Sequence, residues 1–320
     1  KNNTKHSIII SEPTPQKNFP EYIKKDFNFI EFKDRSKFKN FFFDLCISFN
    51  WIGDATKKKI KYKNKKCKFI FFENGHLKDS IIIDPKGLIE KSKYIESLDK
   101  ICKINYKDLK KYINDILNNN YSKRPQNNNL IDLPENILNK FVFMPTQYHK
   151  DKSFLKTKIG MLDGMIKTAL LCKKYKLPFV IKIHPNLVDD DLEYQKNEIK
   201  NIKKNIYENI FLSKMSINKL IKNSYFTVLM NGSSIMDNFI NHSLVISILP
   251  TMYSYTDAVI YKKDLDKSFR KIIKKKYNLD KIIEKQNQII SWYLQNNLFV
   301  SKSVMDNIKA LEYHCKLKII

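Results

Sequence analysis

The sequence has few of the residues that punctuate loops and lacks several familiar signatures. Its 320 residues include 6 glycines and 10 prolines, which excludes collagenous and linker-like chains. No GxxxxGKS, GxGxxG or GxSxG string occurs, so the P-loop, dinucleotide-binding and α/β-hydrolase classes lose their best evidence. The longest apolar runs, such as FKNFFFDLCISF, are broken by polar residues well short of a membrane span.

Cysteines are also few, and their spacing points to no metal site. Cys46, Cys67, Cys102, Cys172 and Cys315 are odd in number and form no CxxC pair. Most of them lie within apolar patterns, where a free cysteine behaves as a small hydrophobic residue. This usage predicts a reducing, cytoplasmic compartment and disfavours a structural zinc site.

Acidic residues are outnumbered by basic ones, and the formal net charge is +26. One interpretation is attraction to a polyanion such as a nucleic acid, an anionic membrane surface or an acidic glycan. The other is composition drift, because Lys, Asn and Ile are over-used everywhere and Lys far outnumbers Arg. Both stay open at this point, and either predicts weak, salt-dependent association with anionic surfaces.

Short apolar runs predict strands in the first part of the chain. They cover residues 7–11, 27–32, 65–75 and 80–84, with a helix running into a strand over 36–49 and helices around 107–118. The polar segment NNNYSKRPQNNN that follows is typical of a surface linker or a long loop.

Beyond this segment, strands and helices alternate regularly. Strands are expected in FVFMPTQ, PFVIKIHP, IFLS, YFTVLMNGSS and LVISILP, with a helical pattern between each pair. Such alternation implies right-handed crossovers and a parallel sheet, and the nearly continuous apolar strands suit a sheet covered on both faces. Helical patterns then fill 264–293 and 301–318.

We therefore expect an α/β fold of two open domains, residues 1–135 and 136–320. Ligands of such sheets bind beyond the carboxyl ends of the strands. The polar residues that follow each strand are therefore the candidate site.

Two strand ends carry carboxylates. Glu73 comes before Gly75, where a positive φ would allow a sharp turn that presents the carboxylate as a general acid or base. Gln147 and Asp151 follow the strand FVFMPT; Asp151 suits a nucleophile, a base or a helix N-cap, and Ser153 is an equal candidate for that cap. A turn or capping role is the simpler alternative for each carboxylate.

Two further strand ends suit a phosphate. Lys182 and His184 stand two residues apart at the end of a buried strand and are followed by Pro185. Because alternate residues of a strand point to the same face, both side chains are expected to reach the crevice. Asn231, Gly232, Ser233 and Ser234 form a strand-to-helix turn whose free N–H groups and helix dipole favour an anion. A satisfied core histidine and a simple serine N-cap are the alternatives.

No other cluster suggests chemistry. Asp189–Asp191 precede a helical pattern and are better explained as a solvated first turn than as metal ligands. The histidines outside the strand ends show no metal spacing; they are His76, His149, His242 and His314. No metal and no cofactor are expected.

These strings resemble the bacterial capsule-polysaccharide synthesis proteins, which are retaining β-Kdo transferases with two Rossmann-like domains of the GT-B type. The family's E-D-G-aromatic-x-R-S element corresponds to Glu73–Ser80, its Q-x-x-x-D element to Gln147–Asp151, and its K-x-H-P element to Lys182–Pro185. A serine-containing turn before a helix corresponds to Ser233 and Ser234. The same HP and Ser-Ser pair also occurs in bacterial CMP-sialic acid transferases.

Three positions depart from the family pattern. Asn74 replaces an acid, His76 an aromatic residue and Lys78 an arginine. Since a lysine cannot make the bidentate carboxylate contact of an arginine, the hold on the acceptor or on the sugar carboxylate is expected to differ.

The resemblance implies transfer of Kdo, or a related 2-keto sugar acid, from a CMP-sugar to an anionic glycan or glycolipid, in a cleft between the two domains. It implies that Asp151 is the nucleophile, that Glu73 activates the acceptor, and that His184 with Lys182 neutralises the departing phosphate. Ser233 and Ser234 would hold that phosphate. The last helices would pack back on the N-terminal domain, and the enzyme would work in the cytoplasm, peripherally at the inner membrane.

Three rival functions stay open. They are a CMP-sialic acid-type transferase, a transferase that uses another nucleotide sugar such as a UDP-sugar, and a basic nucleic-acid-binding module. The last has only the charge in its favour, because the 59 lysines and arginines are dispersed and most aromatic residues lie in apolar strings. No specific nucleic-acid partner is expected.

Overall fold

The computed structural model describes residues 6–10, 27–31, 45–49, 65, 67–76, 80–84, 98, 106–119, 132–149, 154, 157 and 159–295. The chain divides into two compact units, Lys1–Ile70 and Phe71–Ile320. The division expected between residues 135 and 136, and the cleft expected there, stay predictions. Among the described residues, no helix combines the length and the apolar character needed to cross a membrane.

The first unit contains short strands. β1 (His6–Ile10) and β2 (Phe27–Glu31) pair in parallel, with His6 opposite Phe27, and β3 (Leu45–Phe49) follows. Burial, and secondarily the neighbouring Cys67, raises the pKa of the Cys46 thiol to about 11, so this cysteine stays protonated. The strands expected at residues 7–11 and 27–32 are confirmed to within one residue.

The second unit opens with a hairpin and a helix. β4 (Lys68–Asn74), which begins in the first unit, pairs antiparallel with β5 (Ile81–Asp84), so that Glu73 lies opposite Ile82. Helix α4 (Tyr106–Asn118) then buries one stripe spaced at helical intervals, Leu109, Ile113 and Ile116.

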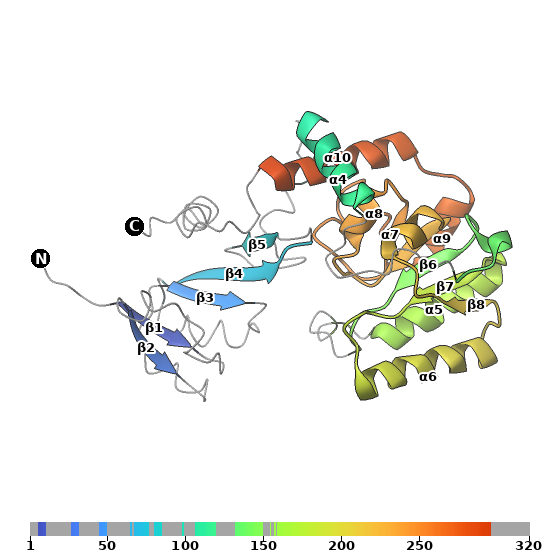
Figure 1. Cartoon of the computed structure of the whole chain (residues 1–320), viewed down its shortest axis with the longest axis horizontal. Coiled ribbons are helices and arrows are strands. Elements are labelled where there is room, and N and C mark those ends of the chain that lie inside the picture. The colour runs from blue at the N-terminus through green and yellow to red at the C-terminus, as the bar shows by residue number, and fades with distance from the viewer. Residues whose placement is uncertain are drawn as a thin grey trace, which may run out of the picture. The chain divides into compact units, whose positions relative to one another are not determined.

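A five-stranded parallel sheet forms the centre of the second unit (Figure 1). After the short 3-10 helix η4 (Glu135–Ile137), its elements follow along the chain as β6 (Val142–Pro145), α5 (Met161–Tyr175), β7 (Phe179–Lys182), α6 (Asp189–Asn205), β8 (Ile210–Leu212), α7 (Ile217–Lys222), β9 (Phe226–Leu229), α8 (Ile235–Ile240) and β10 (Val245–Ser247). The spatial order is β10-β9-β6-β7-β8, and every described pairing in it is parallel. The strand–helix alternation expected from the sequence is confirmed.

Helices cover both faces of this sheet, which explains why its strands are apolar without alternation. Met144 faces a core that also contains Met165 of α5 and Ile199 of α6, whereas the next residue back, Phe143, faces a second core with Leu220 of α7. Successive side chains of a strand point to opposite faces, so both must be apolar when both faces are covered.

The last described helices are α9 (Leu265–Ile273) and α10 (Leu279–Gln295). The helical patterns expected over 264–293 are confirmed, as two helices with a break between them. The chain leaves α9 through Lys275, which has a positive φ of 49°, and Asn278 caps α10 by accepting a hydrogen bond from the Lys281 N–H at 3.0 Å. The helix expected at 301–318 lies outside the described residues.

Helix α5 approaches the sheet very closely at one glycine. A β-carbon at Gly164 would overlap the sulfur of Met230, the buried residue that follows β9, and would stand 3.3 Å from the Ile248 Cδ1 atom. A side chain at this position would displace Met230, so the glycine serves the contact between helix and sheet rather than a special backbone conformation.

We predict that Gly164→Ala lowers the free energy of unfolding by about 1 kcal/mol. Alanine is the better helix former by about 1 kcal/mol, but overpacking a buried site costs more, about 1–3 kcal/mol. Urea unfolding measures the difference. The matched control is Gly160→Ala at the start of the same helix, where the nearest atom would be the Asp163 Oδ2 at 3.6 Å. If Gly164→Ala is as stable as this control, the close approach of α5 is wrong.

Candidate functional site

The order of the strands selects one position on the sheet edge. From β6 the chain moves outward to β7 and β8, then returns to place β9 on the other side of β6. The loops that follow β6 and β9 therefore lead away in opposite directions from adjacent strands. In open α/β sheets this is the position where ligands bind, at the carboxyl ends of the two strands.

Gln147 and Asn231 join these two loops. The Gln147 Nε2 donates to the Asn231 Oδ1 at 3.4 Å, and the Asn231 backbone N–H donates to the Gln147 Oε1 at 3.2 Å. Gly232 lets the glutamine lie against the turn, since a β-carbon there would stand 3.0 Å from the Gln147 Cδ. The structure thus brings Gln147 into contact with Asn231, 84 positions further along the chain. Both were selected from the sequence because they follow predicted strands.

Gln195 of α6 completes this arrangement, and sequence reasoning missed it. Its Nε2 donates to the backbone oxygen of Gln147 at 2.7 Å, and the residue is 1% exposed. The Gln195 Oε1 is buried without a hydrogen-bond partner among the described residues. In the sequence Gln195 is one polar residue in a polar helix, so no pattern marks it as buried.

His184 is oriented by contacts on several sides. Its backbone N–H donates to the Thr146 Oγ1 at 2.9 Å, and its Nδ1 accepts a hydrogen bond from the Asn186 N–H at 3.2 Å. The ring lies 5.1 Å from that of Tyr148, whose hydroxyl donates to the Asn186 oxygen at 2.6 Å. Because Nδ1 accepts, the neutral imidazole carries its proton on Nε2 and can donate from there. Pro185, next to it, is exposed.

Lys182 is held by the loop that follows β8. Its Nζ donates to the backbone oxygens of Met215 at 2.6 Å and Lys214 at 3.3 Å, beyond the end of β8. Burial lowers the pKa of Lys182, and the nearby Asp132 carboxylate offsets part of that effect. The ammonium group therefore serves first to hold the β8 loop.

Asp132 is a second residue that the sequence did not reveal. It accepts hydrogen bonds from the Ser213 hydroxyl at 2.6 Å and from the Lys214 N–H at 2.7 Å. It precedes the first strand of the sheet in a polar stretch, so the strand-end rule could not find it. Together with Lys182 it fixes the loop after β8.

The Ser233–Ser234 turn leads from β9 into α8. Ser234 is the N-cap residue with φ −59° and ψ −7°, and its side chain makes no capping hydrogen bond. Both serines are half-buried. The simple N-cap expected as an alternative is therefore not formed, and both hydroxyls stand at the same edge as Asn231.

The remaining predicted residues are only partly described. Asp151 and Lys78 lie outside the described residues, and Glu73 is described only as a backbone position of β4. Gly75 closes the hairpin by donating its N–H to the Ser80 oxygen at 2.7 Å. Its φ is not in the positive region that the sequence suggested; glycine is required because a β-carbon would overlap Ser80.

A buried chain of hydrogen bonds ties this hairpin to two distant segments. The His76 Nδ1 lies 2.8 Å from the Tyr253 hydroxyl, which lies 2.7 Å from the Tyr293 hydroxyl of α10. Both tyrosines are 0% exposed. The sequence marked His76 only as a departure from the family pattern and gave no motif after Thr251, so nothing indicated that these three side chains meet.

The aspartates at the start of α6 belong to no group of described side chains that could hold a metal ion. Asp189–Asp191 make up the first turn of that helix, and the Asp191 Oδ1 lies 3.6 Å from the His149 Nδ1. Within the described part of the chain, no group of three or more histidine, cysteine or acidic side chains could hold a metal ion.

Comparison with solved structures identifies known proteins that share the fold of this chain. No family model matches the chain, and no curated protein matches its sequence. Among solved structures, KpsC of Thermosulfurimonas dismutans, a beta Kdo 2,4 transferase, matches with a TM-score of 0.54 and 12% identity over 89% of each chain. The beta Kdo 2,7 transferase of KpsC from the same organism matches with a TM-score of 0.50 and 15% identity, over 82% of this chain and 88% of that one.

The chain has the fold of these transferases. At such low identity the likeness shows the fold alone, and it confirms the expected α/β class of the GT-B type. Gln147, Asn231 and His184 lie at the carboxyl edge of the parallel sheet of this fold.

We predict that Tyr253→Phe lowers the free energy of unfolding by about 1–2 kcal/mol, because it removes hydrogen bonds to two partners in a buried setting. Urea unfolding measures the loss. The matched control is Tyr255→Phe, whose side chain is 57% exposed and whose loss should be under about 0.5 kcal/mol. Equal stability of the two variants would contradict the hydrogen-bonded chain.

We also predict a pH effect from Lys182. Its pKa is lowered in the folded protein, so between that value and the ordinary 10.5 the unfolded chain binds more protons. The free energy of unfolding therefore rises with pH in this window, relative to Lys182→Met. Urea unfolding of both proteins from neutral pH to 10.5 measures the difference.

The variant Asp132→Asn tests the cause of that effect. The Asp132 carboxylate favours the charged form of Lys182, so its removal lowers the pKa of Lys182 further. The free energy of unfolding should therefore begin to rise at a lower pH. A difference between wild type and Lys182→Met that does not change with pH would show that the lysine is not buried as described.

Proposed function

We propose that the chain is a glycosyltransferase that transfers Kdo, or a related 2-keto sugar acid, from a CMP-sugar to an anionic glycan or glycolipid acceptor. The observation that carries the proposal is the likeness to the KpsC Kdo transferase over 89% of both chains. The motifs Gln147–Asp151, Lys182–Pro185 and Ser233–Ser234 support it, since the first residue of each lies near the carboxyl edge of the parallel sheet, the edge at which open α/β sheets bind their ligands.

The proposed reaction has two displacements. The Asp151 carboxylate attacks the anomeric carbon as the bond to the CMP phosphate breaks, which gives a glycosyl-enzyme adduct and free CMP. The acceptor hydroxyl then attacks that carbon, Glu73 takes its proton, and Asp151 leaves. Two inversions give net retention.

His184 is the proposed donor to the departing phosphate. Its Nδ1 accepts from the Asn186 N–H, so Nε2 bears the proton that a developing phosphate charge would attract. The Ser233–Ser234 turn would bind the same phosphate through hydroxyl and backbone N–H groups. Lys182, held on the β8 oxygens, would add a fixed positive charge, and these groups would carry the task without a metal or a cofactor.

Gln147 has a positioning role in this scheme. It stands four residues before Asp151 and is fixed by Asn231, Gln195 and Gly232. A nucleophile must stay within about 0.5 Å of its productive position, so a rigid start of the loop favours catalysis.

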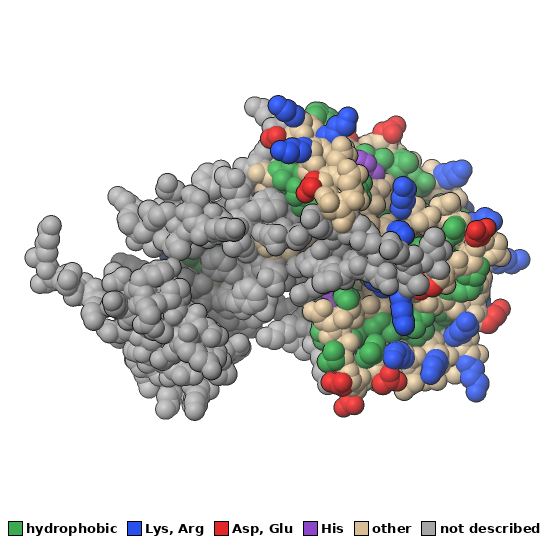
Figure 2. Space-filling model, in the orientation of Figure 1, with side chains coloured by type: hydrophobic (Ala, Val, Ile, Leu, Met, Phe, Trp, Pro, Cys, Tyr) green, Lys and Arg blue, Asp and Glu red, His purple; other side chains and the backbone are tan. Residues whose placement is uncertain are grey.

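The surface charge suits an anionic acceptor better than a nucleic acid. On the face shown in Figure 2, the described lysines and arginines are spread out with acidic residues between them. Nucleic-acid sites gather basic residues on one face, often with exposed aromatic residues. Dispersed charge instead favours weak, salt-dependent contact with an anionic inner-membrane surface, which is the proposed place of work in the cytoplasm.

We predict that CMP raises the melting temperature by about 5 °C at a hundredfold excess over its Kd, since such binding adds about 2.7 kcal/mol. UDP and GDP should act less. In Asp151→Ala, CMP should still stabilise the protein, whereas transfer from CMP-Kdo should be lost, because that variant lacks only the nucleophile. Thermal shift and a transfer assay with CMP-Kdo measure the two effects.

The alternatives appear as other outcomes of the same experiment. Transfer from CMP-sialic acid but not CMP-Kdo would favour the sialic acid-type enzyme, and a larger shift by UDP would favour a UDP-sugar donor. Tight binding of a nucleic acid at physiological salt, with no response to CMP, would contradict the transferase.

A further inference from the structure

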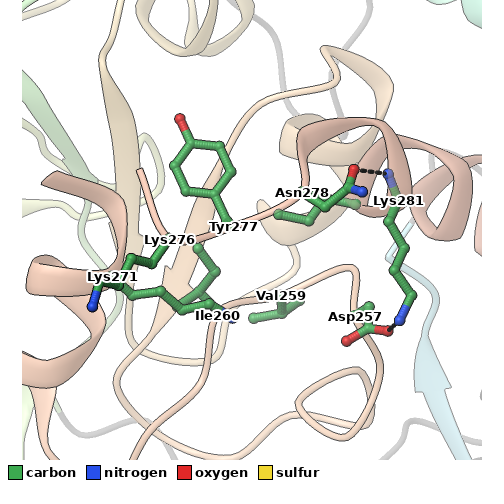
Figure 3. A pocket seen from close by; sticks show the side chains of 9 residues that line it. Asp257, Val259, Ile260, Lys271, Lys276, Tyr277, Asn278 and Lys281 are labelled. Atoms are coloured by element: carbon green, nitrogen blue, oxygen red, sulfur yellow. Dashed lines mark hydrogen bonds and ion pairs between the residues drawn. The ribbon is translucent and has the colours of Figure 1, made fainter. Parts of the chain in front are cut away.

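A pocket with a volume of about 370 Å³ lies away from the candidate site. It is formed by the segment 257–260, by the connection from α9 to α10, and by the first turn of α10 (Figure 3). This volume is at the lower end of the range for small-molecule sites, which suits one or two sugar rings.

The pocket lies near the amino end of the edge strand β10. Ile260 pairs in parallel with Ile246 of β10, and the Gln286 Nε2 donates to the oxygens of Ser243 and Ala258, which precede these two positions. The candidate site lies at the carboxyl ends of β6, β7 and β9 in the same sheet. The two sites are therefore at opposite edges of one sheet, and a single small ligand cannot occupy both.

Positive charge dominates the lining. Lys271, Lys276 and Lys281 line the pocket together with one carboxylate, Asp257. The Lys281 Nζ lies 2.7 Å from the Asp257 Oδ2, so this acid is already paired. Within the described residues, Lys271 and Lys276 form no ion pair, and they stand on the side of the pocket opposite Asp257 (Figure 3). An anion would complete this arrangement.

The floor of the pocket is apolar. Val259, Ile260 and Ile282 are buried to 6%, 4% and 6% exposure, and the first two lie between the two lysine sides (Figure 3). A bare inorganic anion would lose hydration against such a floor without gaining contacts. A sugar ring offers a C–H face to the floor, hydroxyls to Asn278, and a carboxylate to the lysines.

We infer that this pocket binds an acidic saccharide, a sugar ring that bears a carboxylate, at a distance from the transfer site. The saccharide part of the inference rests on the proposed function, in which the acceptor is itself an anionic glycan. A growing acidic chain held at the far edge of the sheet would stay with the enzyme between transfers, because a second contact raises the effective concentration of its end.

The probe is D-glucuronate, with D-glucose and inorganic phosphate as comparisons, and ligand-observed NMR at low salt measures the Kd of each. Glucuronate should bind the whole chain at least about tenfold more tightly than either comparison, as expected when charged and apolar contacts act together. Lys271→Gln/Lys276→Gln should weaken glucuronate binding by about tenfold.

The matched control is Lys200→Gln/Lys204→Gln on α6, which removes the same charge from two exposed lysines outside the pocket. It should change the Kd less than twofold. An equal loss in both double variants would mean that net charge alone attracts the sugar acid, and would overturn the inference. Phosphate binding as tight as that of glucuronate would overturn the saccharide class.

Two readouts separate this inference from the proposed function. Lys271→Gln/Lys276→Gln should keep the full CMP thermal shift, and glucuronate binding should persist in His184→Ala. If CMP stabilises the protein but glucuronate does not bind, the pocket inference fails and the transferase stands. If glucuronate binds and CMP does not, the pocket stands and the transferase fails.

Discussion

Gln147 connects four elements of the second unit, and the candidate site depends on it. It stands near the start of the loop that follows β6, binds Asn231 after β9, receives a hydrogen bond from Gln195 of α6, and places its N–H 3.2 Å from the sulfur of Met161 at the start of α5. An amide group can donate and accept hydrogen bonds at once, so the Gln147 side chain bonds to both the side chain and the backbone N–H of Asn231. A carboxylate or a lysine could not do both.

The sheet was predictable because apolar residues form continuous short runs in its strands and recur at helical spacing in the helices between them. Phe143 and Met144 are both apolar because each meets a different core, and this leaves a continuous apolar run between polar loops. The break between α9 and α10 was not predictable. Lys275 takes a positive φ in a run of lysines that otherwise continues a helical pattern, and no glycine or proline marks the change.

The site was predictable in position but not in its contacts. The rule that ligands bind at carboxyl ends of parallel strands selected Gln147, His184 and Asn231, because it needs only the strand ends. It could not foresee that Lys182 turns towards Met215, since that depends on two unsatisfied backbone oxygens beyond β8. Nor could it pair His76 with Tyr253, which lies 177 residues away, because such contacts follow from tertiary packing alone.

The lysines of the chain exert different electrostatic effects, depending on how exposed each one is. Lys182 is partly buried, so its charge is screened by salt less than that of a fully exposed lysine. The lysines of the α9–α10 pocket are more exposed and exert weaker forces singly, so selectivity there needs the apolar floor as well. The many other surface lysines are screened beyond about 8 Å at physiological salt. A net charge of +26 therefore cannot specify a ligand; only the geometry around particular lysines can.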